Sequence, residues 1–334
     1  MDIFETLKKL NNTFGPAGDE SQTADAIAAL AEPYVDEIIR DTMGNLICHK
    51  KGSGPKVMFA AHMDSIGLIV TYIDKDGFVH FGAVGGINPY SMLYMPVRFK
   101  NGTKGTVGVV GDTDFAKLKL DDLYIDLGVS SEEEALKLVQ VGDVAVFDTQ
   151  TSYAGDSLVS PYQDNRISCT VLLKAMSELL QTKNDLYFVF TVQEEVGLRG
   201  ARTAAYRIEP DYGIAVDVTS TADIPNTKHA SSSMLGKGAA IKVMDASVIC
   251  HPVVVQKLEM LARERNIPWQ KDIIRAGGTD AGAIQQTRTG AYSGGISVPC
   301  RYIHSPAELV RCSDVEACAQ LVCAFAETKL EKEC

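Results

Sequence analysis

The chain has 334 residues, of which 46% are hydrophobic and 22% are charged. These fractions are ordinary for a folded globular protein, so they exclude a wholly disordered chain and a collagen-like fibre. Acidic residues outnumber basic ones by 43 to 32, which gives a formal net charge of −11. This negative surplus repels phosphate backbones and anionic lipid, and it argues against nucleic acid and membranes as partners. The same carboxylates are candidate ligands for cations.

The cysteines and the first residues of the chain bear on its location. The eight cysteines are scattered, with no Cys-x-x-Cys pair, so they predict neither a zinc ribbon nor a redox motif. Residues 1–10 include Asp2 and Glu5 and contain no continuous apolar run, so no signal peptide is predicted. No segment reaches the roughly 20 apolar residues that a membrane helix needs. We therefore expect a cytoplasmic protein with free thiols.

The first part of the chain predicts two helices and a buried strand. The spacing of apolar residues over 3–10 predicts an amphipathic helix, which the Gly and Pro residues of 15–18 end. A second, alanine-rich helix is expected over 23–30. The continuous apolar run 57–61 predicts a strand that is buried on both faces of a sheet.

The middle of the chain, residues 66–160, has a different pattern. Its apolar runs are short, and the residue pairs between them are typical of hairpin turns: Asp76-Gly77, Gly85-Gly86, Asn101-Gly102 and Gly142-Asp143. Ser131 and Glu134 have the spacing of a capping box and predict the start of one short helix. This pattern predicts a small β-rich domain inserted into a larger domain.

In the last part of the chain, buried strands alternate with helices. The expected elements are strands over 186–192 and 212–216 and helices over 168–180, 253–265 and 315–329. Such an alternation predicts an α/β fold, in which helices cover both faces of a sheet. The expected larger domain therefore consists of residues 1–65 and 161–334, with the inserted domain between them.

Polar side chains gather where the expected buried strands end. His62 follows the first of these strands, and the carboxylate of Asp64 can turn back to orient its imidazole. Glu194 and Glu195 follow the second strand, and Asp217 follows the third. In an α/β sheet, ligand sites form beyond the ends of the strands. We therefore expect these side chains to share one site.

Each candidate residue also has a simpler explanation. His62 can be hydrogen-bonded within a turn, Asp164 can cap the helix that follows it, and Thr279-Asp280 can form a turn or the wall of a pocket. Together with His304, however, the candidates include two histidines and enough carboxylates to supply a set of two histidines and three carboxylates. That is the ligand set of a two-metal hydrolytic centre, and mixed nitrogen and oxygen ligands suit zinc, cobalt or manganese. One acid would bridge the metals, and another would stay unligated to transfer protons.

These segments, in this order, resemble the M42 family of metallo-aminopeptidases, the group of glutamyl and tetrahedral aminopeptidases. Some members of that family carry an older endoglucanase label. The sequence differs from the usual family pattern at Ser65 and at Gly238-Ala239, and neither position is a ligand. The motifs that carry the resemblance are Ala61-His62-Met63-Asp64, Asp164-Asn165-Arg166, the segment 194–201, Asp217-Val218-Thr219, the segment 277–281 and the segment 301–305.

The resemblance implies a three-layer α/β/α peptidase domain with a small β-barrel-like insert. It also implies two divalent metal ions per subunit, zinc or cobalt, with Asp164 bridging them. His62 and Asp217 would complete the ligand shell of one metal, and Glu195 and His304 would complete the other.

The resemblance implies that Glu194 is the general base, which takes a proton from the metal-bound water that acts as nucleophile. Asp64 would orient His62 from behind. The family also leads us to expect a cis peptide bond between Asp164 and Asn165.

The implied activity is hydrolysis of N-terminal residues from peptides by a homo-oligomer. The family's assembly is a tetrahedral dodecamer whose contacts the inserted domain mediates. Three alternatives stay open. A related di-metal deacylase or carboxypeptidase would need a basic clamp for a substrate carboxylate. A glycoside hydrolase would agree with the older family label, and a catalytically silent scaffold would use its metals only for structure.

Overall fold

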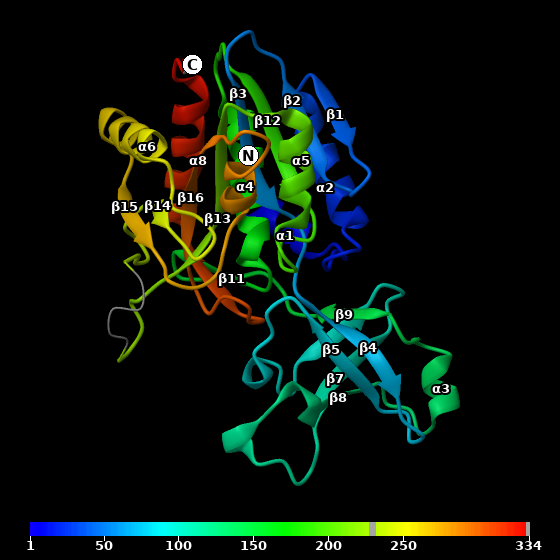
Figure 1. The fold of residues 1–334 in the computed structure, drawn as a ribbon. Helices are drawn as coiled ribbons and strands as arrows, with labels where there is room; N and C mark the ends of the chain where they lie inside the picture. The colour runs from blue at the N-terminus through cyan, green and yellow to red at the C-terminus, as the bar shows by residue number, and fades with distance from the viewer. Residues whose placement is uncertain (227–231, 332–334) are drawn as a thin grey trace.

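In the computed structural model, which describes residues 1–226 and 232–331, a large α/β domain is joined to a small β-barrel (Figure 1). The large domain is built on an 11-stranded sheet, and the barrel is closed by β4, β5, β8, β7, β6 and β9 in that order. The predicted α/β class and the barrel-like insert are confirmed.

The large domain takes its elements from both ends of the chain. The N-terminal ones are α1 (Ile3–Asn11), α2 (Ser21–Ala31), β1 (Glu37–Arg40), β2 (Leu46–Lys50) and β3 (Lys56–His62). After the barrel come β10 (Ser152–Ala154), β11 (Ser157–Ser160), α4 (Gln163–Glu178), β12 (Asp185–Thr191), α5 (Arg199–Ile208), β13 (Tyr212–Ser220), β14 (Ala239–Met244), α6 (Pro252–Glu264), β15 (Trp269–Ile273), α7 (Asp280–Gln285), β16 (Tyr292–Arg301), β17 (Glu308–Arg311) and α8 (Cys312–Glu327).

Four parallel strands form the centre of the large sheet. They lie in the order β12, β3, β13 and β16, and antiparallel strands extend the sheet on both sides. The carboxyl ends of the four strands therefore meet at one edge, where we expected a site. β13 is longer than predicted, because it stays paired with β16 as far as Ser220. Asp217 consequently lies within the strand and not after it.

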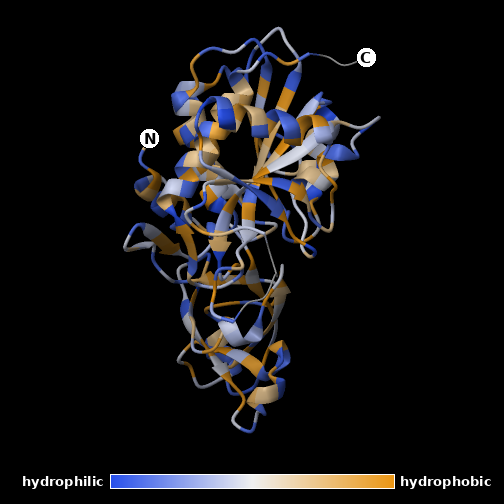
Figure 2. Cartoon of the chain, turned by 90° about the vertical axis from the view of Figure 1, so that its left-hand side faces the viewer, coloured by the Kyte–Doolittle hydropathy of each residue, from blue (hydrophilic) through white to orange (hydrophobic). Residues whose placement is uncertain are grey.

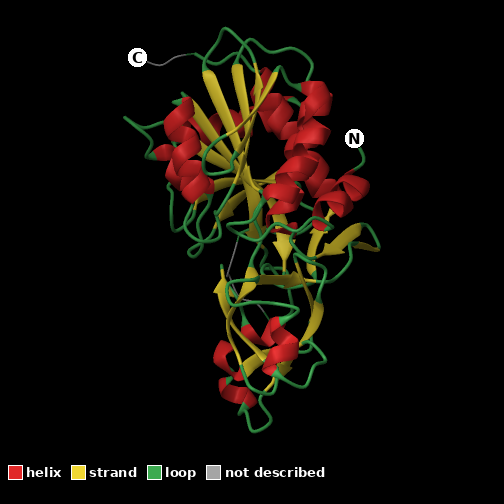
Figure 3. Ribbon diagram, turned by 90° about the vertical axis from the view of Figure 1, so that its right-hand side faces the viewer, coloured by secondary structure: helices red, strands yellow, loops and turns green. Residues whose placement is uncertain are grey.

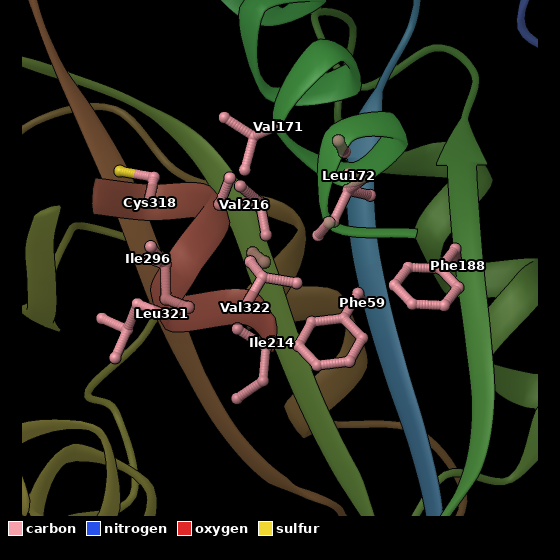
Figure 4. Close-up of a cluster of buried hydrophobic side chains, with 14 of the residues drawn as sticks. Phe59, Val171, Leu172, Phe188, Ile214, Val216, Ile296, Cys318, Leu321 and Val322 are labelled. Atoms are coloured by element: carbon pink, nitrogen blue, oxygen red, sulfur yellow. The ribbon is translucent and has the colours of Figure 1, made fainter. Parts of the chain in front are cut away.

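Side chains of the central strands alternate between two cores. In β3, Val57 and Phe59 belong to the core that includes α4 and α8, whereas Met58 and Ala60 pack with α5 and α7 on the other face. Figure 4 places Phe59 near Leu172, with Phe188 stacked 5.4 Å away between ring centroids. Figure 3 shows helices on both sides of the sheet. The predicted three-layer arrangement is confirmed, and it explains why these strands are apolar on both faces.

Helix α5 covers the sheet because its apolar residues have helical spacing. Ala201, Ala204, Ala205 and Ile208 lie on one face of the helix and are buried. The small alanine side chains let this helix lie close to the strands beneath it. In Figure 2, orange is frequent along the strands of the large domain, and blue is frequent on its outer loops.

The barrel is made of β4 (Gly67–Ile73), β5 (Val79–Val84), β6 (Pro96–Phe99), β7 (Lys104–Val109), β8 (Leu123–Asp126) and β9 (Val144–Phe147), with α3 (Glu132–Leu136) beside it. Asp76-Gly77 and Asn101-Gly102 lie in the hairpin turns of β4–β5 and β6–β7, as predicted. Gly85-Gly86 and Gly142-Asp143 were wrongly predicted to form hairpins. They flank β5 and β9, whose partners are other strands of the barrel.

The end of the inserted domain can be placed from strand pairing. The prediction put the insert at 66–160. The barrel strands run from Gly67 to Phe147, while β10 and β11 pair with each other and with β17 in the large sheet. We therefore propose that the inserted domain ends between β9 and β10, and that residues 1–65 and the chain from β10 onward form the larger domain.

Two further observations concern the chain as a whole. Within the described residues, no helix combines the length and apolar character that crossing a membrane requires. The cysteines from Cys48 to Cys323 are unpaired thiols, which agrees with the prediction, and Cys334 lies outside the described residues.

Candidate metal centre

Six of the predicted site residues line one cavity of about 550 Å³ at the carboxyl edge of the sheet. His62 is the last residue of β3, Asp217 lies in β13, and Asp164 lies in the first turn of α4. Glu194 and Glu195 follow β12, and His304 lies between β16 and β17. The structure thus brings together residues that are more than two hundred positions apart in the sequence.

Asp164 lies between the two histidines. Its Oδ1 is 2.9 Å from Nε2 of His62, and its Oδ2 is 3.3 Å from Nε2 of His304. Asp217 Oδ1 is 3.8 Å from the His62 nitrogen, and Glu195 Oε1 is 3.1 Å from the His304 nitrogen. The donor atoms therefore form two groups that share Asp164. Ligand atoms of His62, Asp164 and Glu195 all lie within 4.8 Å of one another.

The donor set fits divalent cations. Glu195 Oε1 is buried and, among the described residues, receives no well-aligned hydrogen bond, although His304 Nε2 lies 3.1 Å away. Burial raises the pKa of Glu195 and raises the pKa of Asp217 well above its usual range, and the charge of Asp164 adds to both effects. Burial alone would also raise the pKa of Asp164, but its contacts with His304 and His62 lower it instead. Crowded, buried carboxylates favour a neutralising cation.

Two further carboxylates hold the backbone that carries these side chains. Asp64 accepts hydrogen bonds from the backbone N–H groups of Glu194 and Glu195, at 3.0 and 3.2 Å. Its carboxylate is 3.5 Å from Nδ1 of His62, and its backbone carbonyl is 3.2 Å from the same nitrogen. Asp64 therefore lies close to the imidazole and also fixes the loop after β12, and its role in orienting His62 stays a prediction.

Glu308 does the same on the other side of the site, and the sequence reasoning missed it. Its carboxylate accepts hydrogen bonds from the backbone N–H of Asp164 at 2.8 Å and from that of His304 at 2.7 Å. Glu308 is 2% exposed and begins β17, four residues after His304. An acid at the start of an apolar strand was the signal that could have found it.

The backbone is unusual around the site. The predicted cis peptide bond between Asp164 and Asn165 is present. The side-chain amide of Asn165 donates to the carbonyl of Val216, which ties this turn to β13. Several non-glycine residues near the site have positive φ angles, a conformation that concentrates at functional sites. They are Tyr162, Gln193, Leu198, Tyr302 and His304.

Comparisons with known proteins identify the family of the chain. The family model for M42 glutamyl aminopeptidases matches residues 44–321. This chain belongs to the M42 peptidase family. A putative aminopeptidase of Acetivibrio thermocellus is 50% identical to it over 322 residues, which are 96% of this chain and 97% of that protein.

Two solved structures resemble the M42 chain along its whole length. The aminopeptidase APDkam598 of Desulfurococcus kamchatkensis matches with a TM-score of 0.94 and 39% identity, covering 97% of this chain and 94% of that one. The TET1 peptidase of Pyrococcus horikoshii, described as assembling into a tetrahedron or a large octahedral shell, matches with a TM-score of 0.89 and 32% identity. That match covers 98% of this chain and 99% of that one. The M42 chain is thus a peptidase hydrolase.

The cavity is also lined by residues outside the predicted metal site. Of these, only Thr279 was predicted from the sequence to line a pocket. Thr279 lines the cavity, while Asp280 is buried behind it and accepts a 2.5 Å hydrogen bond from Thr191. Gly86 also lines the cavity, and a Cβ atom at this position would lie 2.7 Å from Nδ1 of His304. The pair Gly85-Gly86 is therefore explained by a close approach to the site. Of the apolar wall residues, Leu198, Val218 and Ile303 lie in segments that carry the family resemblance, whereas Ile274 and Ala276 belong to no motif and gave no signal.

Proposed function

We propose that this M42 peptidase is a di-metal aminopeptidase that removes N-terminal residues from peptides. The observation that carries the proposal is the position of Asp164, whose two carboxylate oxygens each face a different histidine. A carboxylate in that position can bridge two cations.

The residues that would hold the ions are His62 and Asp217 for one, and His304 and Glu195 for the other, with Asp164 shared. Zinc or cobalt suits this set of imidazole and carboxylate donors. When bound, the ions polarise the scissile carbonyl and lower the pKa of water toward about 7.

Glu194 is the proposed general base. It lies beside the centre and lines the cavity with its side chain 10% exposed, and its Oε2 is 3.9 Å from Nε2 of His62, farther than Asp164. In the proposed reaction its carboxylate takes a proton from the attacking water as the new C–O bond forms. It then delivers that proton to the amine nitrogen as the C–N bond breaks. Such proton transfer contributes about 10²- to 10⁴-fold to the rate.

The charge of the cavity favours an aminopeptidase over the alternatives. A carboxypeptidase would need a lysine or arginine for the terminal carboxylate, and none is among the described residues that line the cavity. A glycoside hydrolase would release sugars and not amino acids.

We also propose a cytoplasmic homo-oligomer, a tetrahedral dodecamer like that of the family, which acts on peptides and not on folded proteins. The TET1 likeness and exposed aromatic residues on the barrel support it. Tyr90 and Phe115 are each about half exposed, and the Tyr90 hydroxyl donates to the Phe115 carbonyl, so the two lie together.

A chelation assay on paired substrates tests the proposed activity. The protein is stripped of metal and assayed on leucine p-nitroanilide and on its N-acetylated form, before and after zinc or cobalt is added. We expect hydrolysis of the free-amine substrate only, abolished by stripping and restored by metal. Release of acetate from the acetylated substrate would indicate a deacylase. Activity that persists without metal would contradict the di-metal mechanism.

A further inference from the structure

We infer that the preferred substrates carry an uncharged, apolar N-terminal residue, such as leucine, and that Ile274 helps to select it. The inference rests on the proposed function. The amine and the scissile carbonyl must lie at the cluster of histidines and carboxylates. The first side chain therefore has to lie against the rest of the cavity wall.

The rest of that wall is apolar or small. Among the described residues, its remaining members are glycine, serine and threonine, together with Leu198, Val218, Ile274, Ala276 and Ile303. These apolar residues come from the position just before α5, from β13, from the segment after β15 and from the segment between β16 and β17. A branched aliphatic side chain would be desolvated there without leaving a polar group unpaired.

The threonines of the wall are turned toward buried acids behind it. The Thr279 hydroxyl donates to Asp245 at 3.0 Å, and the Thr219 hydroxyl donates to Asp272 at 2.8 Å. Lys242 is buried between these acids, with its Nζ 2.6 Å from Asp272 and 4.0 Å from Asp245. The network supports two sides of the cavity from behind. Lys242 is paired with the two acids of this network, so it does not supply a positive charge to the cavity wall.

The nearby arginines do not supply a charge to the wall either. Arg301 pairs with Asp223 at 2.7 Å. Arg275 is exposed between Ile274 and Ala276, both of which line the cavity, whereas Arg275 is not among the described lining residues.

A charged first residue would therefore be disfavoured in either sign. A glutamate carboxylate would lie beside the acidic cluster with no lysine or arginine among the described lining residues to pair it, and burying an unpaired charge is costly. A lysine ammonium would find only the carboxylates that the metal centre uses. The family is described as glutamyl aminopeptidases, but an N-terminal glutamate does not suit the wall of this cavity.

The first test compares p-nitroanilides of leucine, alanine, glutamate and lysine with the metal-loaded protein. We expect kcat/KM for leucine to exceed the values for glutamate and lysine by at least about 100-fold. A preference for glutamate or lysine would overturn the inference while leaving the aminopeptidase activity intact. A preference for glutamate would also indicate that Arg275 turns into the cavity. Hydrolysis of none of the four would overturn the proposed function and this inference with it.

The second test changes the wall. Ile274→Ala is expected to lower kcat/KM for leucine about tenfold, because the wall loses apolar contact, with little change for alanine. Ile273→Ala is the matched control, since Ile273 is the exposed neighbour at the end of β15 and is not among the lining residues. Ile274→Lys should raise the ratio of glutamate to leucine hydrolysis. Equal losses on leucine and alanine, or an equal effect of Ile273→Ala, would overturn the role of Ile274. Thermal melting checks that each variant is folded.

Discussion

Two acids that are not among the described residues lining the cavity hold the backbone of the candidate site residues. Asp64 holds the backbone of Glu194 and Glu195, and Glu308 holds the backbone of Asp164 and His304. Each acid thus fixes a pair of site residues from opposite sides of the cavity. Such supporting groups determine how precisely ligands are held, and they matter to metal affinity almost as much as the ligands.

Glu308→Gln should weaken metal binding. Glutamine can accept only one of the two backbone hydrogen bonds, so either Asp164 or His304 loses its support. We expect the affinity for zinc to fall about 10- to 100-fold, measured by competition with a chromogenic chelator. Glu264→Gln, on the exposed end of α6, is the control and should bind zinc like the wild type. Unchanged affinity in Glu308→Gln would show that Glu308 does not position the ligands.

Glu20 links the start of α2 to the loop that carries the proposed base. Its carboxylate accepts hydrogen bonds from Gly18 and from Gln193, at 2.7 and 3.2 Å. Burial raises the pKa of Glu20 from its usual 4.5 to about 7, and the nearby charge of Asp64 adds to this effect. The folded state thus holds a proton that the unfolded chain has already lost between these two pH values.

The stability that this proton provides is complete below pH 4.5 and is lost as the pH rises through about 7. Glu20→Gln keeps an acceptor without the charge. Its free energy of unfolding, relative to the wild type, should therefore rise between pH 5 and pH 8, by at most on the order of 3 kcal/mol at about 1.4 kcal/mol per pKa unit. Denaturant titrations at both pH values measure it. A difference that does not change with pH would refute the assignment.

The sequence predicted the candidate metal ligands and the candidate base, whose side chains face the cavity. His62, Glu194 and Asp217 stand out because polar residues follow or end apolar runs. Glu308 accepts backbone hydrogen bonds, a role that any buried acid or amide can fill, so its place at the start of a strand is the one signal that the sequence offers. Only the folded chain shows which N–H groups it meets.

At the scale of elements, the position of Glu194 and Glu195 depends on how the loop after β12 turns into α5. The N–H of Gly200 donates to the carbonyl of Val192, and the side chain of Asn45 bridges both residues. A Cβ atom on Gly200 would come closer than 3.0 Å to Asn45 and to the Val192 backbone. The glycine thus allows the close packing that turns the chain after Glu195.

Gly200→Ala should strain this turn. We expect the free energy of unfolding to fall by about 1–3 kcal/mol, as for other overpacked sites, with a lower kcat because the loop moves. Gly111→Ala is the matched control, since a Cβ atom there meets no described atom within 4 Å. Chemical denaturation and steady-state kinetics measure both effects. A harmless Gly200→Ala would contradict the proposed packing constraint.

Elements were predictable where periodicity alone decides them. The strands over 57–61 and 186–192 and the helices over 253–265 and 315–329 were placed within a few residues of β3, β12, α6 and α8. Strand pairing was not predictable, because it depends on partners far along the chain. That is why the extension of β13 and the membership of β10 and β11 in the large sheet were missed.

At the scale of the whole molecule, a barrel projects from the catalytic domain (Figure 1). Exposed aromatic residues on such a projection suit contact with another copy of the chain. If the chain forms a dodecamer, its mass should be about twelve times 36.1 kDa. The four carboxylates of the centre account for only a few of the 43 acids, so most of the negative charge lies elsewhere.

Phe115→Asp should shift the protein toward smaller particles, because it places a charge in the proposed contact. Analytical ultracentrifugation measures the distribution of masses. Leu180→Asp, at an exposed position of the larger domain, is the control and should keep the wild-type mass. A monomeric wild type, or no shift in Phe115→Asp, would contradict the proposed role of the barrel.

The central claim is that Glu194 moves protons at a centre whose ions are held by other residues. The most direct measurement combines metal analysis and steady-state kinetics on Glu194→Gln, with Glu195→Gln in parallel. We predict that Glu194→Gln keeps close to the wild-type metal content but loses activity by at least about 10²-fold. Glu195→Gln should lose both metal and activity. If Glu194→Gln lost its metal together with its activity, or kept its activity, the assignment of Glu194 as the base would be contradicted.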